Sequence, residues 1–218
     1  MKQIKAVIFD LDGTVANTLP LCISAFRQSI EPLVNRHVSD EEIIETFGPS
    51  EEGTIRSLAP DHYDKGVADY LLHYEASHHM CPAPFPGIAE LLNFLKEKGV
   101  HVSIVTGKGR KSAMISLKQF QFENVFEFLE AGSPAGSRKA EGIQDILEKL
   151  DGVSKEEVIY VGDVPSDIVV SRKAGVVSVA AAWAETAESK KLLALKPDEI
   201  FYSIEDFFAW LKGKIADS

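Results

Sequence analysis

Two aspartates close the first apolar segment of the chain. Asp10 directly follows the apolar residues 6–9, Asp12 stands two residues later, and a glycine and a threonine come next. Two carboxylates this close repel each other, so something must offset their charge. A carboxylate at a strand end can attack phosphorus and form an aspartyl phosphate. A second carboxylate two residues on points the same way in an extended chain, where it can protonate the leaving oxygen and then activate water.

Phosphate-binding groups are predicted at two other places. Thr106, Gly107 and Lys108 directly follow the β-branched segment at residues 101–105, and Lys139 begins a predicted helix. A hydroxyl, backbone amides in a tight turn and an ammonium group are donors that bind phosphate oxygens. The sequence therefore predicts that these residues hold a phosphate.

Two more aspartates follow a third apolar segment, at residues 158–161. Asp163 stands just after its end, and Asp167 follows four residues later. Several carboxylates at one point need a cation. Hard oxygen ligands favour Mg²⁺, which one or two carboxylates usually hold together with phosphate oxygens and water. Asp10, Asp163 and Asp167 are therefore the predicted metal ligands, and Mg²⁺ is the predicted cofactor.

These residues need a scaffold that brings them together, and the apolar pattern predicts one. Nearly continuous apolar runs, typical of strands buried on both faces, alternate with amphipathic stretches that end at glycines. This alternation predicts a doubly wound α/β fold with a parallel sheet, in which ligands bind at the carboxyl ends of the strands. The expected strands are residues 6–10, 101–107, 157–163 and 176–183, with weaker ones at 126–132 and 199–203, and the clearest helices are 88–99 and 142–152.

A segment without strand character follows the first strand. It ends in a stiff connector with three prolines. We predict an all-helical domain of residues 16–82, inserted into an α/β core domain of residues 1–15 and 83–218. Helical periodicity is clearest at residues 21–34, 40–47 and 63–79.

The inserted domain is the part that can read the leaving group, because the core has little room for it. The candidate is a loop at residues 47–56. Gly48 belongs to a turn that can dip toward the site, and Arg56 can hold a second anionic group. Glu51 and Glu52 would instead repel an anion and favour hydroxyls or a cation. These hints conflict, so the leaving group stays open.

Composition limits the partners. The chain has 218 residues, a hydrophobic content of 45% and a formal net charge of −10, which argues against a nucleic-acid or anionic-membrane surface. No apolar run approaches the ~20 residues of a membrane span, and the start has no signal-peptide pattern. Cys22 and Cys81 fit reduced thiols. We expect a cytoplasmic protein with a small phosphorylated metabolite as partner, working as a monomer with a dimer as the alternative.

Four motifs in one order carry a family resemblance. They are DLDGTVANT at residues 10–18, VTGK at 105–108, Lys139, and VGDVPSD at 161–167. Together they resemble the motifs of the haloacid dehalogenase-like (HAD) hydrolases over nearly the whole chain. The inserted segment is similar to the small helical cap (C1 type) of the branch with phosphoglycolate phosphatase and β-phosphoglucomutase. The resemblance implies a Rossmann-like core and a Mg²⁺-dependent reaction through an aspartyl phosphate.

The resemblance also implies a role for each matched residue. Asp10 would be the nucleophile, Asp12 the general acid/base and Thr106 the phosphate ligand. Lys139 would neutralise the phosphoryl charge. The family motif often reads Lys-Pro at this point and here does not, so the neighbouring Arg138 is an alternative.

The metal site implied by the resemblance uses two further aspartates. Asp163 would bind Mg²⁺, with Asp167 in support, and the backbone carbonyl of Asp12 would be an additional ligand. These assignments extend the ligand set that the carboxylates alone predict.

The predicted function is a phosphoric monoester hydrolase of a small phosphorylated metabolite. Asp12 indicates an oxygen leaving group, because the dehalogenase and phosphonate-cleaving branches of the family lack an acid at this position. A phosphomutase like β-phosphoglucomutase, a pyrophosphatase and a 5′-nucleotidase of the same family are the alternatives. Outside the family, a signalling receiver domain would be much shorter, and a binding protein would not need an intact nucleophile and acid.

Overall fold

Six parallel strands form one sheet in the computed structural model, which describes residues 2–215. The strand order is β3-β2-β1-β4-β5-β6, so the predicted doubly wound α/β class is confirmed. The two weaker predicted strands are real but shorter than expected. Met1 and residues 216–218 of the predicted core domain lie outside the described residues. The strands are β1 (Ala6–Phe9), β2 (His101–Val105), β3 (Phe128–Glu130), β4 (Val158–Gly162), β5 (Val177–Ala181) and β6 (Glu199–Phe201).

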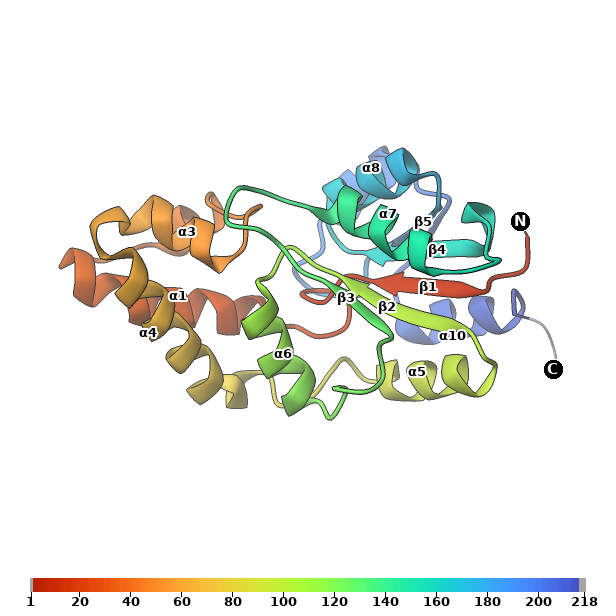
Figure 1. Ribbon diagram of the computed structural model, residues 1–218, viewed down its shortest axis with the longest axis horizontal. Helices are drawn as coiled ribbons and strands as arrows, with labels where there is room; N and C mark the ends of the chain where they lie inside the picture. The colour runs from red at the N-terminus through yellow and green to blue at the C-terminus, as the bar shows by residue number, and fades with distance from the viewer. Residues whose placement is uncertain (1, 216–218) are drawn as a thin grey trace.

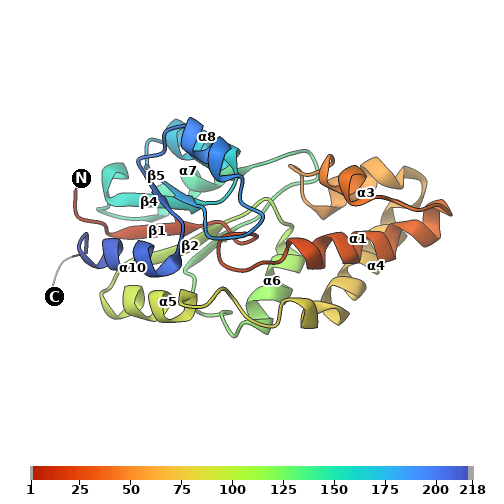
Figure 2. The same cartoon turned by 180° about the vertical axis from the view of Figure 1, so that it is seen from behind.

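Helices cover both faces of this sheet (Figures 1 and 2). They are α5 (Ile88–Glu97), α6 (Arg110–Gln119), α7 (Lys139–Lys149), α8 (Pro165–Ala174), α9 (Ser189–Ala194) and α10 (Ile204–Lys212), with the 3₁₀ turn η3 (Lys155–Glu157). Ala6 and Ile8 of β1 pack in one apolar cluster with α7 and α8. Val7 and Phe9 pack in another with α5 and α10. Because alternate side chains of a strand are buried on opposite faces, the strand reads as one apolar run.

The chain between β1 and α5 forms a helical unit, which we call the cap. It consists of α1 (Leu19–Val34), α2 (Asp40–Ile44), α3 (Glu51–Leu58), α4 (Tyr63–Ala76) and the 3₁₀ turns η1 (Pro60–His62) and η2 (His78–Met80). Helices α1 and α4 pack through aromatic rings, with 4.3 Å between the centroids of Phe26 and Tyr70. The cap lies beyond the carboxyl ends of the strands, and the described ends of the chain lie on the opposite side of the core (Figures 1 and 2).

The predicted loop at residues 47–56 is half helix, which corrects that prediction. Only the turn before Glu51 is irregular, and α3 begins at that residue. Ser50 takes the extended conformation of an N-cap residue, and two glutamates fill the first turn, where the helix dipole favours acidic side chains. The helix matters because its periodicity determines which side chains of residues 51–56 lie on the same face of α3.

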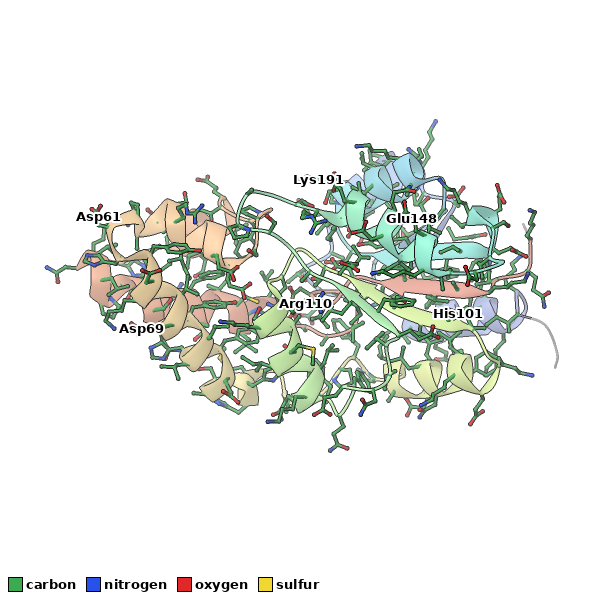
Figure 3. All side chains as sticks on the ribbon, viewed as in Figure 1. Asp61, Asp69, His101, Arg110, Glu148 and Lys191 are labelled. Carbon is green, nitrogen blue, oxygen red and sulfur yellow. The ribbon has the colours of Figure 1, made fainter. Side chains whose placement is uncertain are left out.

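Charged side chains lie on the outside of both units. Asp61 on the cap and Glu148 and Lys191 on the core are exposed (Figure 3). No helix among residues 2–215 combines the length and the apolar character needed to cross a membrane.

The register of the central strands brings the candidate residues to one edge. Phe9, the last residue of β1, pairs with Ile104 of β2 and Val161 of β4. The amide of Asp10 continues the ladder and donates to the carbonyl of Val161 at 2.8 Å. The residues that follow the three strands therefore meet at the point where the strand order reverses, which is where open α/β sheets bind ligands.

Candidate active site

Three buried carboxylates meet at this edge of the sheet. Asp10, Asp163 and Asp167 each offer an oxygen, and these oxygens lie within 4.8 Å of one another. The backbone amide of Leu11 donates to Asp10 Oδ1 at 2.7 Å, and the Thr14 hydroxyl donates to Asp163 Oδ1 at 3.0 Å. The aspartates that follow β1 and β4 therefore lie together, as the sequence predicts.

A buried ammonium group holds two of these carboxylates. Lys139 Nζ lies 2.6 Å from Asp10 Oδ2 and 2.6 Å from Asp167 Oδ1. Asp167 also accepts hydrogen bonds from the Tyr160 hydroxyl at 3.1 Å and the Val164 amide at 3.1 Å. Three donors thus fix Asp167, which in turn positions Lys139.

Arg138, the alternative cation, points elsewhere. Its side chain is about half exposed and lies 3.6 Å from the Asp145 carboxylate. The structure therefore brings Lys139, and not its neighbour, to the carboxylates. The reason is that α7 begins at Lys139, which is buried beneath the sheet edge, whereas Arg138 precedes the helix on the outside.

The charge in this cluster is not balanced by the protein alone. Burial raises the pKa of Asp10 to about 6, although Lys139 opposes the shift. Burial, and then the charges of Asp10 and Asp167, hold the pKa of Asp163 well above its usual range. Burial alone would lower the pKa of Lys139, but the two carboxylates outweigh it and raise that pKa above its ordinary value. Three carboxylates facing one ammonium group are a donor set that fits a divalent cation with oxygen ligands.

Mg²⁺ is expected to stabilise the folded protein. A ligand that binds only the folded state adds about 2.7 kcal/mol at a concentration of about 100 Kd. For a chain of this size that is a rise in Tm of roughly 5–10 °C, measured by calorimetry with Mg²⁺ and with EDTA. Asp163→Asn should lose the shift, and Asp145→Asn, which changes a partly exposed carboxylate, should keep it. An equal shift in both variants would place the ion elsewhere.

The turn after β1 depends on a glycine. Gly13 has φ +76°, and a Cβ atom built there would lie 2.1 Å from Asp163 Oδ2. The Trp183 indole nitrogen donates to the Thr14 carbonyl at 3.0 Å and holds the turn from the other side. The turn therefore has room for Asp163 only because position 13 has no side chain.

Gly13→Ala should be much more damaging than Gly99→Ala. Both positions have positive φ, but nothing lies within 4 Å of a Cβ atom at Gly99. Gly99→Ala should cost about 1–2 kcal/mol for the left-handed backbone alone. Gly13→Ala should cost roughly 3 kcal/mol or more and lower kcat about 100-fold, because Asp163 must move. Urea unfolding and steady-state rates measure both, and equal losses would contradict the close contact.

Asp12 lies on the cap side of the cluster, with its carboxylate half-buried. Its Oδ1 accepts a hydrogen bond from the Thr18 hydroxyl and lies 3.3 Å from Lys108 Nζ. Lys108 is buried and also contacts Cys22 Sγ at 3.1 Å, with its ammonium 4.5 Å from the centroid of the Tyr74 ring. The Lys108 side chain therefore links Asp12 to two cap helices, a contact that the sequence analysis did not predict.

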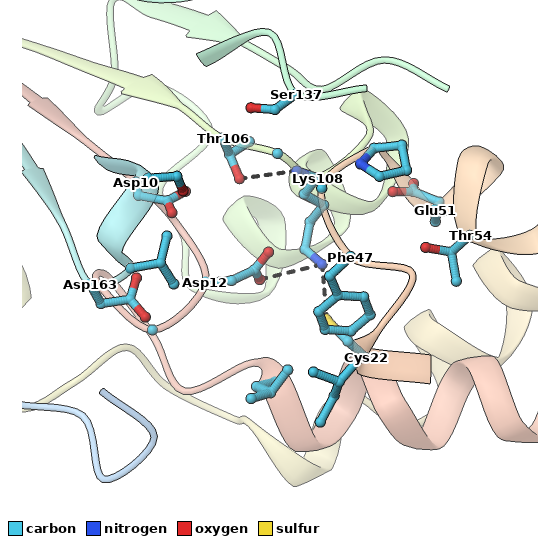
Figure 4. A pocket seen from close by; sticks show the side chains of 18 of the residues that line it. Asp10, Asp12, Cys22, Phe47, Glu51, Thr54, Thr106, Lys108, Ser137 and Asp163 are labelled. Carbon is cyan, nitrogen blue, oxygen red and sulfur yellow. Dashed lines mark hydrogen bonds and ion pairs between the residues drawn. The ribbon is translucent and has the colours of Figure 1, made fainter. Parts of the chain in front are cut away.

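Thr106 follows β2 and lies between Asp10 and Lys108 in the view of Figure 4. The Thr106 side chain is buried, and its hydroxyl accepts the amide of Lys108 at 3.2 Å. Thr106, Gly107 and Lys139 all line one cavity with Asp10 and Asp163.

This cavity has a volume of about 570 Å³ and lies between core and cap. Gly48 lines it, as predicted, beside Phe47. Arg56 is not among the described residues that line it. The Arg56 guanidinium instead lies 4.7 Å from the centroid of the Tyr63 ring, on the exposed side of α3. The structure therefore does not bring Arg56 to the cavity with the other predicted site residues.

Glu51 has a different place from the one its charge suggested. Its buried carboxylate accepts the Gly109 amide at 2.7 Å and the Ser112 hydroxyl at 2.7 Å, at the N-terminus of α6. Nearby, the Ser50 amide donates to the Ser133 carbonyl at 2.9 Å. These bonds fasten the cap to the core beside the cavity. The Ser50-Glu51 pair at the start of α3 is typical of a helix N-terminus. Nothing in the sequence, however, indicates that the Glu51 carboxylate binds the N-terminus of α6.

Comparisons with known proteins agree with this arrangement. The sequence model described as haloacid dehalogenase-like hydrolase matches residues 7–181. The chain is 32% identical to pyrophosphatase PpaX of Halalkalibacterium halodurans over 206 residues, which is 94% of this chain and 95% of that protein. It is 30% identical to pyrophosphatase PpaX of Bacillus pumilus over 208 residues, with coverage of 94% and 95%.

Solved structures share the fold. A haloacid dehalogenase-like family hydrolase from Streptococcus pneumoniae matches with a TM-score of 0.75 and 26% identity, over 95% of this chain and 98% of that one. A predicted phosphoglycolate phosphatase from Haemophilus somnus matches with a TM-score of 0.77 and 20% identity, over 96% and 99%. At that identity the second match concerns the fold alone.

Proposed function

The chain belongs to the haloacid dehalogenase-like hydrolase family, and on that premise we propose that it is a Mg²⁺-dependent phosphatase. It would hydrolyse a small phosphorylated substrate through an aspartyl-phosphate intermediate. One observation carries the proposal. Asp10 lies in the buried cluster with Asp163 and Lys139, and Asp12 lines the same cavity.

The proposed reaction has two steps, and each balances. An oxygen of the Asp10 carboxylate attacks phosphorus, and the bond from phosphorus to the leaving oxygen breaks. The leaving oxygen keeps the electron pair and takes a proton from Asp12. Water then attacks the aspartyl phosphate, Asp12 takes the proton of that water, and Asp10 is regenerated as phosphate leaves.

Three donors are proposed to hold the transferring phosphoryl group. Lys139 supplies a fixed positive charge beside Asp10, and the Thr106 hydroxyl and the Gly107 amide supply hydrogen bonds. Because these groups are held by the fold before substrate arrives, they need little reorganisation during the reaction.

We propose that Asp10, Asp163 and the backbone carbonyl of Asp12 would hold Mg²⁺. When bound, the ion would offset the negative charge that the phosphoryl group and the carboxylates bring together. Asp167 would position Lys139 and would not bind the ion directly, because its oxygens already accept hydrogen bonds from three donors.

The proposal includes a division of the chain. Residues 1–15 and 83–218 would form the catalytic core, and residues 16–82 the cap that excludes water and selects the leaving group. Cys22 and Cys81 are free and buried, which suits a reducing, cytoplasmic setting.

Pyrophosphate hydrolysis is the second candidate, because the relatives at 32% and 30% identity are named pyrophosphatases. The experiment that tests both is phosphate release from pyrophosphate, phosphoglycolate, sugar phosphates and nucleoside monophosphates, with Mg²⁺ and with EDTA. Mg²⁺-dependent release is the expected result. Phosphate release that needs no metal would contradict the proposal. So would the absence of phosphate release from every substrate of the panel. Activation by a bisphosphorylated sugar would instead indicate a phosphomutase.

A further inference from the structure

The cavity contains few cations, and those it has are already paired. Among the described residues that line it, the lysines and arginines are Lys108 and Lys139, which face four carboxylates. Lys139 is held by Asp10 and Asp167, and Lys108 lies between Asp12, Cys22 and the Tyr74 ring. The carboxylates are Asp10, Asp12, Glu51 and Asp163.

A second anionic group on the substrate would therefore meet an unfavourable wall. Beyond the phosphoryl position, the charged side chains of the cavity are Asp12, Lys108 and Glu51. Lys108 Nζ lies 3.3 Å from Asp12 Oδ1, and Glu51 is held in place by the N-terminus of α6. Arg56, which could have supplied a free cation, lies outside the cavity on Tyr63.

The cap side of the cavity is largely apolar, although Glu51 and Thr54 of α3 also line it. Leu19 and Phe26 of α1, Ile44 of α2 and Tyr70 of α4 line it, together with Phe47 (Figure 4 labels Phe47). Ile44 is 45% exposed and Phe47 is 39% exposed, so both keep apolar surface that a ligand can cover. Phe47 is braced by Phe26, with 6.0 Å between the ring centroids.

The cavity is also larger than a diphosphate requires. Its volume of about 570 Å³ lies within the range of roughly 300–1,000 Å³ that is typical of pockets for drug-sized ligands. A diphosphate would leave the aromatic wall facing water, whereas an apolar body would cover it.

We infer that the leaving group is an uncharged alcohol with an aromatic or aliphatic body. The substrate class is then a phosphomonoester of an apolar alcohol, and this inference rests on the proposed phosphatase function. The phosphoryl group lies at Asp10, the ester oxygen lies beside Asp12, and the apolar body packs against Phe47 and Ile44.

The first arm of the test compares substrates with the wild-type protein and Mg²⁺. Benzyl phosphate and cyclohexylmethyl phosphate carry apolar bodies on alkyl-type oxygens, so an activated leaving group does not favour them. Phosphoglycolate and pyrophosphate carry a second anionic group. We expect kcat/KM for the apolar pair to exceed that for the anionic pair by about 10-fold or more.

The second arm adds a cation to the wall. Phe47→Arg should shift the ratio of kcat/KM at least about 10-fold toward phosphoglycolate and pyrophosphate. Leu72→Arg is the matched control, because it adds the same charge to a cap side chain that is 66% exposed and does not line the cavity. The ratio in this control should equal the wild-type ratio.

The outcomes separate this inference from the proposed function. Mg²⁺-dependent release that favours pyrophosphate or phosphoglycolate would overturn the inference and leave the phosphatase intact. An unchanged ratio in Phe47→Arg would also overturn it, because the wall would not contact the leaving group. No release from any phosphorylated compound would overturn the proposed function, and the inference with it. If Phe47→Arg does not fold, the first arm still decides.

Discussion

Asp10→Asn is expected to abolish turnover while the protein stays folded. The amide keeps the shape of the carboxylate and can still accept the Leu11 amide at Oδ1, but it cannot attack phosphorus as an anion. Loss of a nucleophile typically lowers kcat by about 10⁴-fold or more. The measurement is phosphate release with Mg²⁺ on the best substrate of the panel, together with intact mass after rapid acid quench to detect a phosphorylated protein.

Two companion variants make this result specific. Asp12→Asn should slow the reaction by about 10²–10⁴-fold, because it removes the acid and base but leaves the nucleophile. It should also accumulate the phosphorylated protein, which Asp10→Asn cannot form. Asp145→Asn, which changes a partly exposed carboxylate beside Arg138, should match the wild type. A phosphorylated Asp10→Asn protein would show that another residue is the nucleophile.

The sheet was predictable because its strands are buried on both faces. Segments such as residues 158–161 are apolar along their whole length, a pattern typical of strands in a parallel sheet between helix layers. The edge strand β3 was harder to delimit. All three of its residues are only partly buried, so the apolar pattern there is weak and three residues were found where seven were expected.

The site was predictable where the chain itself fixes the geometry. Asp10 and Asp163 follow central strands in register, so their meeting follows from the topology. The places of Glu51 and Arg56 follow from α3, a helix where the sequence predicts a loop. In a helix that starts at Glu51, Arg56 lies about 140° further around the axis, whereas Thr54 returns to the face of Glu51 and lines the cavity.

The Lys108 side chain shows what the sequence does not carry. Its backbone position after β2 was predictable. Its contacts with Cys22 and Tyr74 depend on how the cap packs against the core, which is a tertiary arrangement without a local signal. For the same reason the apolar wall around Phe47 emerged only from the structure.

Lys139→Met is the second variant with a large expected effect. It removes the ammonium group that holds Asp10 and Asp167 and leaves buried carboxylates without their partner. Breaking a buried ion pair in this way typically costs about 3–5 kcal/mol. The rate should fall by about 10³-fold, because a charge that stabilises the transferring phosphoryl group is lost. Urea unfolding in EDTA and phosphate release with Mg²⁺ measure the two effects.

The loss of stability in Lys139→Met should depend on pH with a defined sign. Burial already raises the pKa of Asp10 from 3.8 to about 6 in the wild type, where Lys139 opposes the shift. The folded state then binds the proton more tightly than the unfolded state, so stability falls as pH rises from about 4 to about 6. Without Lys139 the pKa of Asp10 in the folded protein should rise further, so stability keeps falling to a higher pH. The loss of unfolding free energy relative to wild type should therefore be larger at pH 8 than at pH 5. Arg138→Met, which changes an exposed neighbour, should show neither the loss of stability nor its pH dependence. A stability deficit in Lys139→Met that does not change with pH would contradict this account. It would mean that lost packing, and not uncompensated carboxylate charge, destabilises the variant.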